Sequence, residues 1–300
     1  MPDDARGAAI ALGNFDGVHI GHQAVIAAAR AVAGARGIAA GAAVFEPHPR
    51  RFFNPELPPF RLQTPRQRAR ALAAAGVTEL FEIEFDAALA KSTDRAFAER
   101  VLRDLLAAAH VSVGADFRFG RGRMGDAASL SALGAELGFT VEAVSPKLDG
   151  GRKISSTAIR DAIARGDLGD ARRMLSRPWA IEGDVLRGFE RGRKLGCPTA
   201  NLALGDYVRP RFGVYAVRID LGDGVLLPGV ASIGVNPTVG ALPAPILEAH
   251  LLDFSGNLYG KRIEVELIAF LRDEENFPDL DALRRQMAQD VVEARRALIE

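Results

Sequence analysis

Two histidines lie within a glycine-rich stretch near the start of the chain, where their spacing suits phosphate chemistry. Residues 13–22 read GNFDGVHIGH and lie between an apolar run and a predicted helix over 23–33. A turn from a strand into a helix exposes backbone N–H groups and the positive end of the helix dipole, and glycine lets an anion approach closely. Because His19 and His22 can donate hydrogen bonds to charge on a phosphoryl group, we expect an anion site here.

The spacing of the glycines argues against two common nucleotide sites. It follows G-x₃-G-x₃-G rather than the G-x-G-x-x-G of dinucleotide-binding folds, and no G-x₄-G-K-[ST] occurs in the chain. A metal site at His19 and His22 is the weaker interpretation, because no further His or Cys cluster lies nearby. A single histidine would more often be structural, so it is the pair that indicates function.

A run of hydroxyls before a later helix offers a second set of phosphate ligands. Residues 154–160 read ISSTAIR, so Ser155, Ser156 and Thr157 precede a predicted helix over 158–164. Such hydroxyls either cap the helix or hold phosphate oxygens. Capping accounts for one hydroxyl rather than for three followed by an arginine, Arg160, so this pattern favours phosphate binding.

The elements that must position these residues alternate through the first half of the chain. Short apolar runs predict strands over 8–12, 42–45, 80–85, 111–113 and 141–144, and the stretches between them predict helices, including 65–75 and 96–109. Strand and helix in alternation imply a parallel sheet with helices on both faces. We therefore predict an N-terminal α/β domain over residues 1–177.

The second half of the chain has a different pattern. Apolar runs over 213–219, 226–233, 246–253 and 263–271 are separated by Gly and Pro, which predicts an antiparallel sheet, expected to close as a barrel. Asp279 is the expected N-cap of a last helix whose apolar residues recur every three or four positions. We predict a C-terminal domain over residues 178–300, ending in this helix.

Composition narrows the classes of function. The chain has 300 residues, 48% of them hydrophobic, with 38 Lys+Arg against 38 Asp+Glu. A net charge of zero gives no general attraction to nucleic acid or to an anionic membrane, so we expect neither as a partner. One cysteine, acidic residues near the start and no long apolar run indicate a cytoplasmic protein. The sequence leaves a homo-oligomer possible and does not decide it.

The motifs together resemble one family, the prokaryotic bifunctional riboflavin kinase/FAD synthetases. Residues 19–22 resemble the HxGH signature of nucleotidylyltransferases, and the whole string GNFDGVHIGH resembles the N-terminal module of this family. Further matching strings are FEPHP at 45–49, GADFRFG at 114–120, ISSTAIR at 154–160, GRKLGCPTANL at 192–202, NPT at 236–238, EAHLLDF at 248–254 and LRDEENF at 271–277. The resemblance implies a Rossmann-like nucleotidylyltransferase domain followed by a riboflavin kinase β-barrel.

The resemblance also implies roles in the N-terminal domain, where FMN and ATP would give FAD and pyrophosphate. Catalysis there would involve His19, His22 and Arg160. ATP would be bound by Gly13, Asn14, Phe15, Gly17, Gly21, Ser156 and Thr157. The flavin would contact His48, Pro49, Asp116 and Arg118, although Asp116 read alone is equally well a turn residue.

In the C-terminal domain the resemblance implies that riboflavin and ATP give FMN. Glu248 would accept the proton of the ribityl hydroxyl, although without the motif it could not be told from Glu264 or Glu266. Thr199 and Asn201 would hold Mg²⁺, for which hydroxyl and amide oxygens are suitable hard ligands. ATP would be bound by Gly192, Lys194, Gly196, Thr199 and Asn201, and the flavin would lie against Arg272 and Glu274.

Three residues depart from the family pattern on the kinase side. Cys197 and Val239 replace phenylalanines, and Arg187 replaces a frequent histidine. Two alternatives therefore stay open. One is an FMN adenylyltransferase with an impaired kinase domain, and the other is a flavin-binding regulator without turnover.

Overall fold

The computed structural model describes residues 6–186, 199–235 and 245–299. The chain forms two compact units, the first of Met1–Pro58 and Pro65–Ser156, the second of Pro59–Thr64 and Thr157–Glu300. Six residues of the N-terminal half therefore pack with the C-terminal unit. The domain boundary between 177 and 178 stays a prediction.

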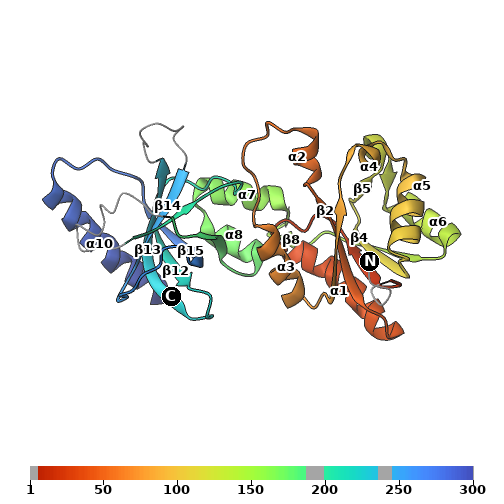
Figure 1. Ribbon diagram of the computed structural model, residues 1–300, viewed down its shortest axis with the longest axis horizontal. Helices are drawn as coiled ribbons and strands as arrows, with labels where there is room; N and C mark the ends of the chain where they lie inside the picture. The colour runs from red at the N-terminus through yellow and green to blue at the C-terminus, as the bar shows by residue number, and fades with distance from the viewer. Residues whose placement is uncertain (1–5, 187–198, 236–244, 300) are drawn as a thin grey trace. The chain divides into compact units, whose positions relative to one another are not determined.

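A five-stranded parallel sheet forms the centre of the first unit (Figure 1). Its order is β3-β2-β1-β4-β7, with β1 at Ala9–Leu12, β2 at Ala40–Glu46, β3 at Glu79–Glu84, β4 at His110–Gly114 and β7 at Thr140–Val144. The register runs in parallel, for example Ala11 opposite Ala42 on one side and Ser112 on the other. The predicted parallel α/β fold is confirmed.

Alternation along β1 divides the core into two layers. Ala11 packs with Val25 and Ile26 of helix α1 (Ile20–Arg36) and with helix α3 (Pro65–Ala74), so small residues face α1. Ile10 and Leu12 point to the opposite face, where they pack with α5 (Asp94–Phe97), the π-helix η2 (Ala98–Leu105) and α6 (Ala127–Leu137). Successive side chains of a strand point to opposite faces, which explains this division.

The helix predicted over 96–109 is wrong at its end and in its type. The structure has the short helix α5 followed by the π-helix η2, which ends at Leu105. The amide of Leu106 donates to the carbonyl of Val101, five residues back, and Ala107 adopts a positive φ of 48°. This left-handed residue turns the chain into β4, which apolar periodicity does not reveal.

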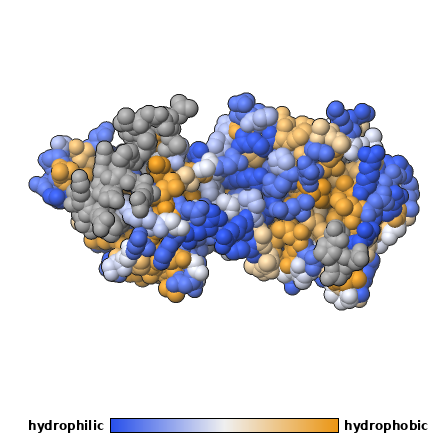
Figure 2. All heavy atoms as spheres, in the orientation of Figure 1, coloured by the Kyte–Doolittle hydropathy of each residue, from blue (hydrophilic) through white to orange (hydrophobic). Residues whose placement is uncertain are grey.

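Short elements complete the first unit. They are α2 (Pro49–Phe53), α4 (Ala87–Lys91), the 3₁₀ turn η3 (Arg121–Arg123) and two small hairpins, β5 (Arg118–Phe119) with β6 (Gly125–Asp126) and β8 (Leu148–Asp149) with β9 (Arg152–Lys153). Exposed apolar side chains of this unit include Phe53 and Met124, and Figure 2 shows hydrophobic surface between hydrophilic regions on its visible face.

The second unit holds a six-stranded antiparallel sheet in the order β10-β15-β12-β13-β14-β11. The strands are β10 (Trp179–Asp184), β11 (Thr199–Ala203), β12 (Gly213–Asp220), β13 (Leu226–Val235), β14 (Pro245–Leu251) and β15 (Arg262–Arg272). The sheet curls until its two ends meet, because the amide of Leu186 after β10 donates to the carbonyl of Asn201 in β11 at 2.8 Å. The predicted barrel is confirmed as a curled, barrel-like sheet.

Helices α8 (Leu168–Leu175) and α10 (Leu280–Ile299) pack against the curled sheet. Helices α7 (Ser156–Arg165) and α8 precede β10, and α10 packs against β12, β13 and β15. Asp279 accepts a hydrogen bond from the amide of Ala282 at 2.7 Å, so the predicted cap of the last helix is confirmed. Among the described residues, no helix is long and apolar enough to cross a membrane.

Candidate active sites

The glycine-rich stretch leaves the carboxyl end of β1, the central strand of the parallel sheet. β1 pairs with β2 on one side and with β4 on the other, so the strand order reverses at this point. In open α/β sheets, the crevice at the carboxyl edge beside such a reversal is where ligands bind. The predicted residues 13–22, 48–49 and 116 all follow β1, β2 or β4 and reach this edge.

His19 and His22 form a stacked pair at the start of α1. His19 is 5% exposed and is the N-cap of the helix, since its Nδ1 accepts a hydrogen bond from the amide of His22 at 3.2 Å. The two rings stack with centroids 3.6 Å apart, and the ring of Phe15 meets His22 edge-on at 5.2 Å. An imidazole thus replaces the usual Ser, Thr or Asp cap, beside backbone N–H groups that favour an anion.

The turn that carries this pair is strained and tightly packed. Phe15 and Val18 have positive φ angles of 50° and 42°, an uncommon conformation for side chains of this size. A Cβ atom at Gly21 would lie 3.1 Å from the ring of His19, so a larger residue here would press on the imidazole that caps the helix. Asn14 has a buried Oδ1 that accepts no hydrogen bond from the described residues.

Ser156 of the hydroxyl run contacts this turn. Ser156 Oγ donates to the backbone carbonyl of Asp16 at 2.8 Å, which ties the start of α7 to the glycine-rich stretch. Thr157 and Arg160 fall in the second unit. There Arg160 Nε donates to the carbonyl of Phe60 at 2.7 Å, and its guanidinium lies 5.5 Å from the centre of the Phe60 ring.

The predicted flavin residues lie where β2 and β4 end. His48 is 4% exposed, and its Nδ1 accepts a hydrogen bond from the amide of Arg50 at 3.1 Å, which caps α2 with Pro49 in the first turn. Beyond the cap, Phe53 is 67% exposed and packs edge-on against Phe85. Sequence reasoning missed this aromatic surface, although the pair of phenylalanines after His-Pro-Arg-Arg was a visible signal.

Asp116 and Arg118 each have an intramolecular partner. Lys153 Nζ hydrogen-bonds to Asp116 Oδ2, and this hydrogen bond holds the pKa of the Asp116 carboxyl below its usual range. Arg118 Nη1 donates to Asp126 Oδ2 at 3.1 Å. Asp116 is thus an anion beside a lysine, and sequence reasoning had not paired it with Lys153.

Strand register gathers the predicted kinase residues on one face of the curled sheet. Asn201 in β11 lies directly opposite Glu248 in β14, and Thr199 lies opposite His250. Ser232 in β13 is the partner of Glu248 on its other side. Alternate residues of a strand share a face, so the hydroxyl, the amide, the carboxylate and the imidazole form one polar patch. Sequence reasoning did not single out His250 or Ser232.

Glu274 and Arg272 have different surroundings. The carboxylate of Glu274 fills the space that a side chain at Gly234 would occupy, two residues from Ser232. Arg272 donates from Nε and Nη2 to both oxygens of the buried Asp290 in α10, at 2.7 and 2.8 Å. The structure therefore gives Arg272 the role of joining β15 to the last helix.

Several predicted residues lie outside the described part of the chain. These are Gly192, Lys194, Gly196, Arg187, Cys197 and Val239. Among the described residues, no group of three or more His, Cys, Asp or Glu side chains could hold a metal ion. Thr199 and Asn201 form a sparser set of oxygen donors, which fits a hard cation bound mainly through substrate phosphates.

Comparison with known proteins identifies both modules. A model of the FAD synthetase family matches residues 1–158, and a model of the riboflavin kinase family matches residues 175–298. A bifunctional riboflavin kinase/FMN adenylyltransferase of Pseudomonas fluorescens is 44% identical over 97% of this chain and 93% of its own length. Its counterpart in Escherichia coli K12 is 41% identical, over 97% and 92%.

A solved structure has the same fold over nearly the whole chain. It is described as a macrolide-efflux protein from Streptococcus pneumoniae and superposes with a TM-score of 0.87 at 30% identity, covering 97% of this chain and 94% of that one. The fold and the matches define a transferase with two catalytic modules. The chain belongs to the family of bifunctional riboflavin kinase/FMN adenylyltransferases, which confirms the predicted family and activities.

Proposed function

We propose that the polar face of β11 and β14 phosphorylates riboflavin and that the turn after β1 adenylylates the resulting FMN. The observation that carries this assignment is the register of β11 and β14, which sets Asn201 opposite Glu248 and Thr199 opposite His250. Residues from two separate sequence motifs thereby meet on one face. The substrates and products, namely riboflavin, ATP, FMN and FAD, follow from the family's activity.

In the kinase step, Glu248 accepts the proton of the ribityl 5′-hydroxyl as that oxygen attacks the γ-phosphate of ATP. The bond from the γ-phosphorus to the ADP oxygen breaks, and ADP leaves. Thr199 and Asn201 would hold Mg²⁺, which neutralises charge on the phosphates when it is bound. Glu274 borders the flavin on the same face, near Gly234.

In the adenylylation step, a phosphate oxygen of FMN attacks the α-phosphate of ATP, and the bond to pyrophosphate breaks. No covalent enzyme intermediate is needed, so binding geometry and charge stabilisation provide the catalysis. His19 and His22 donate to the phosphates at the N-terminus of α1, beside Ser156 of the same unit. The part of Thr157 and Arg160 in this step is proposed from the family motif alone. His48, Pro49, Asp116 and Arg118 position the flavin.

A time course tests this assignment. The purified protein is incubated with riboflavin, excess ATP and Mg²⁺, and the flavins are separated by chromatography, with a parallel reaction started from FMN. We expect FMN to rise first and then to convert to FAD. FAD from FMN without FMN from riboflavin would indicate a kinase disabled by its departures at Cys197 and Val239, and no turnover in either reaction would favour a flavin-binding regulator.

The same proposal places the enzyme in the cytoplasm, acting on free flavins and ATP without a nucleic acid partner. Its one cysteine and its net charge of zero support this placement.

A further inference from the structure

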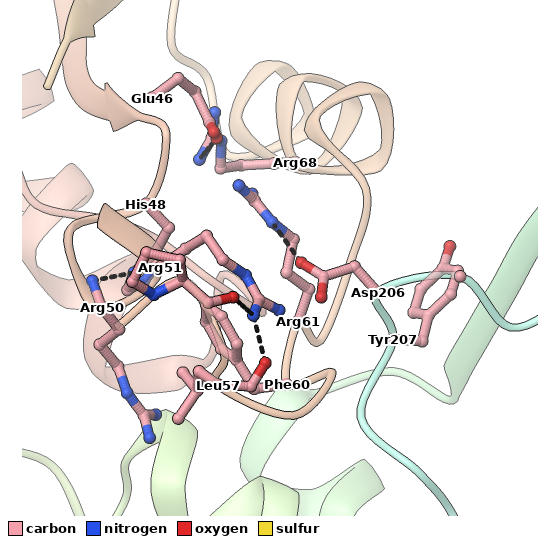
Figure 3. A network of polar contacts seen from close by, with 12 residues as sticks. Glu46, His48, Arg50, Arg51, Leu57, Phe60, Arg61, Arg68, Asp206 and Tyr207 are labelled. Atoms are coloured by element: carbon pink, nitrogen blue, oxygen red, sulfur yellow. Dashed lines mark hydrogen bonds and ion pairs between the residues drawn. The ribbon is translucent and has the colours of Figure 1, made fainter. Parts of the chain in front are cut away.

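A buried arginine joins two strands of the parallel sheet beside the flavin residues of the first unit. Arg68 of α3 is 2% exposed. Its Nη1 lies 2.8 Å from Glu46 Oε1 at the end of β2, and its Nη2 lies 3.1 Å from Glu82 Oε1 in β3. Its Nε is buried and has no hydrogen-bond acceptor among the described residues. Figure 3 shows Arg68 extending toward Glu46, next to the segment that carries His48.

The two carboxylates that bind this guanidinium lie at different positions in their strands. Glu46 is the last residue of β2 and is separated from His48 by a single proline, so its side chain fixes the chain where it leaves the sheet. Glu82 lies inside β3, opposite Val44, with regular strand on both sides. Only the contact with Glu46 therefore acts on the His48 turn, which we define as residues 46–49.

Of the three charged side chains, the arginine loses the most contact with water. The side chains of Glu46 and Glu82 keep 25% and 50% of their exposure, whereas the guanidinium has lost nearly all of its hydration. A buried charge of this kind is retained only where its partners are well placed, and a neutral apolar residue is often as stabilising. A role in orienting the turn accounts for the charge better than a role in stability alone.

We propose that Arg68 is a positioning residue of the FMN adenylyltransferase site, which holds Glu46 and through it the His48 turn in the geometry that binds FMN. The inference rests on the proposed contact of His48 and Pro49 with the flavin. Arg68 does not touch substrate in this arrangement, and its effect reaches FMN through the backbone between Glu46 and Pro49.

Steady-state kinetics on the full-length protein test the proposal. Glu46→Gln and Glu82→Gln each remove one negative charge from the same guanidinium, so they form a matched pair, and Arg68→Met removes the guanidinium itself. Arg70→Met, on the exposed face of α3, is the control for losing an arginine from this helix. The KM for FMN and the KM for ATP are measured in FAD formation, and riboflavin phosphorylation is measured on the same preparations.

We expect Arg68→Met and Glu46→Gln to raise the KM for FMN on the order of tenfold, since small displacements of positioning groups have large effects. The KM for ATP and the riboflavin kinase rate should stay within about twofold of wild type, as should every constant of Glu82→Gln and Arg70→Met. Equal effects of Glu46→Gln and Glu82→Gln, or an unchanged KM for FMN in Glu46→Gln, would overturn the proposal.

Two further outcomes are informative. If Arg68→Met does not fold, the pair of glutamine variants decides the question, because each keeps the arginine. If the wild-type protein forms no FAD from FMN, the proposed function itself fails and the inference falls with it, whereas failure of the inference alone leaves wild-type FAD formation intact.

Discussion

At the scale of single residues, the hydrogen bond to His19 fixes which atom of its ring carries the proton. Because Nδ1 accepts from the amide of His22, the neutral ring holds its proton on Nε2, and that nitrogen is the one able to donate. The same hydrogen bond and the stacked rings hold His19 and His22 against each other. Helix capping by Nδ1 and the proposed phosphate contact thus use different nitrogens of one imidazole.

Removal of one ring of this pair should separate the two activities. We expect His22→Ala to reduce FAD formation from FMN by a factor on the order of 10² or more, because a donor to the transition-state charge is lost. FMN formation from riboflavin should be unchanged, as measured by chromatography of both reactions on one preparation. Loss of both activities in a folded variant would show that the two-site assignment is incorrect.

Glu248, on the polar face of β11 and β14, permits the converse test. We expect Glu248→Gln to lower riboflavin phosphorylation by roughly 10² to 10⁴, because the amide keeps the shape of the side chain but cannot accept the proton. FAD formation from supplied FMN should continue at the wild-type rate. Glu264→Gln, on β15, is the matched control, and an equal loss in that variant would remove the reason for assigning Glu248 as the base.

At the scale of elements, the amino end of β4 carries a buried polar group far from the site edge. His110 begins this strand, with its Nδ1 2.8 Å from Thr140 Oγ1 and its Nε2 2.9 Å from Ser112 Oγ. Burial lowers the pKa of His110 below the ordinary value. The unfolded chain therefore binds a proton at a higher pH than the folded chain does.

This difference predicts a pH dependence of stability. As the pH falls below about 6.5, the unfolded state takes up the His110 proton first, so stability decreases toward the lower pKa of the folded state. We expect the urea midpoint of the first unit, followed by circular dichroism, to fall less over this window in His110→Gln than in wild type. Parallel curves for the two proteins would contradict the prediction.

Regular patterns in the sequence predicted most of the helices and strands but not all of them. The alternation of Ile263, Val265 and Leu267 with glutamates indicates β15, and Asp279 indicates the start of α10. β11 was not predicted as a strand, because Gly and Pro dominate the motif that ends in it. The π-helix η2 was interpreted as an α-helix, since its eight residues are too few for apolar periodicity to distinguish the two.

Some features of the candidate sites could likewise be predicted from the sequence, and others could not. A contiguous motif such as residues 13–22 carries its own signal, and strand alternation puts Glu248 and His250 on one face. The pairs Asp116 with Lys153 and Arg68 with Glu46 gave no signal, because each joins single charged residues that are distant in the sequence. Only the packing of the whole unit brings such residues together.

At the scale of the whole molecule, the chain passes between the two units three times rather than once. Residues 59–64 pack with the second unit, where Trp179 Nε1 donates to the carbonyl of Leu62 at 2.7 Å. Thr64 Oγ1 donates to the buried carboxylate of Glu182 at 3.1 Å, and Arg61 approaches Asp206 at 3.4 Å (Figure 3). Part of the kinase core is therefore encoded within the FAD synthetase match.

A substitution in this segment should affect the distant module. We expect Thr64→Val to destabilise the second unit by about 1 to 3 kcal/mol, because Glu182 loses a donor while buried. Trp179 is the only tryptophan in the sequence, so its fluorescence during urea unfolding reports on the second unit. Heat inactivation of the kinase should be accelerated more than that of FAD formation.

The matched control lies in the first unit. Thr78 Oγ1 donates to the carbonyl of Ala40 at 3.1 Å, so Thr78→Val removes a comparable hydrogen bond there. We expect it to leave the Trp179 transition unchanged. A shift of that transition by Thr78→Val but not by Thr64→Val would contradict the assignment of residues 59–64 to the second unit.

The packing of residues 59–64 with the second unit also determines how the halves of such enzymes can be exchanged. A chimaera joined between 158 and 175, where neither family match applies, would combine the kinase of one species with a core segment inherited from another. Leu62 and Thr64 would then face a foreign Trp179 and Glu182. The segments that form the kinase core are therefore discontinuous in the sequence. A functional chimaera must take residues 59–64 and the C-terminal half from the same species.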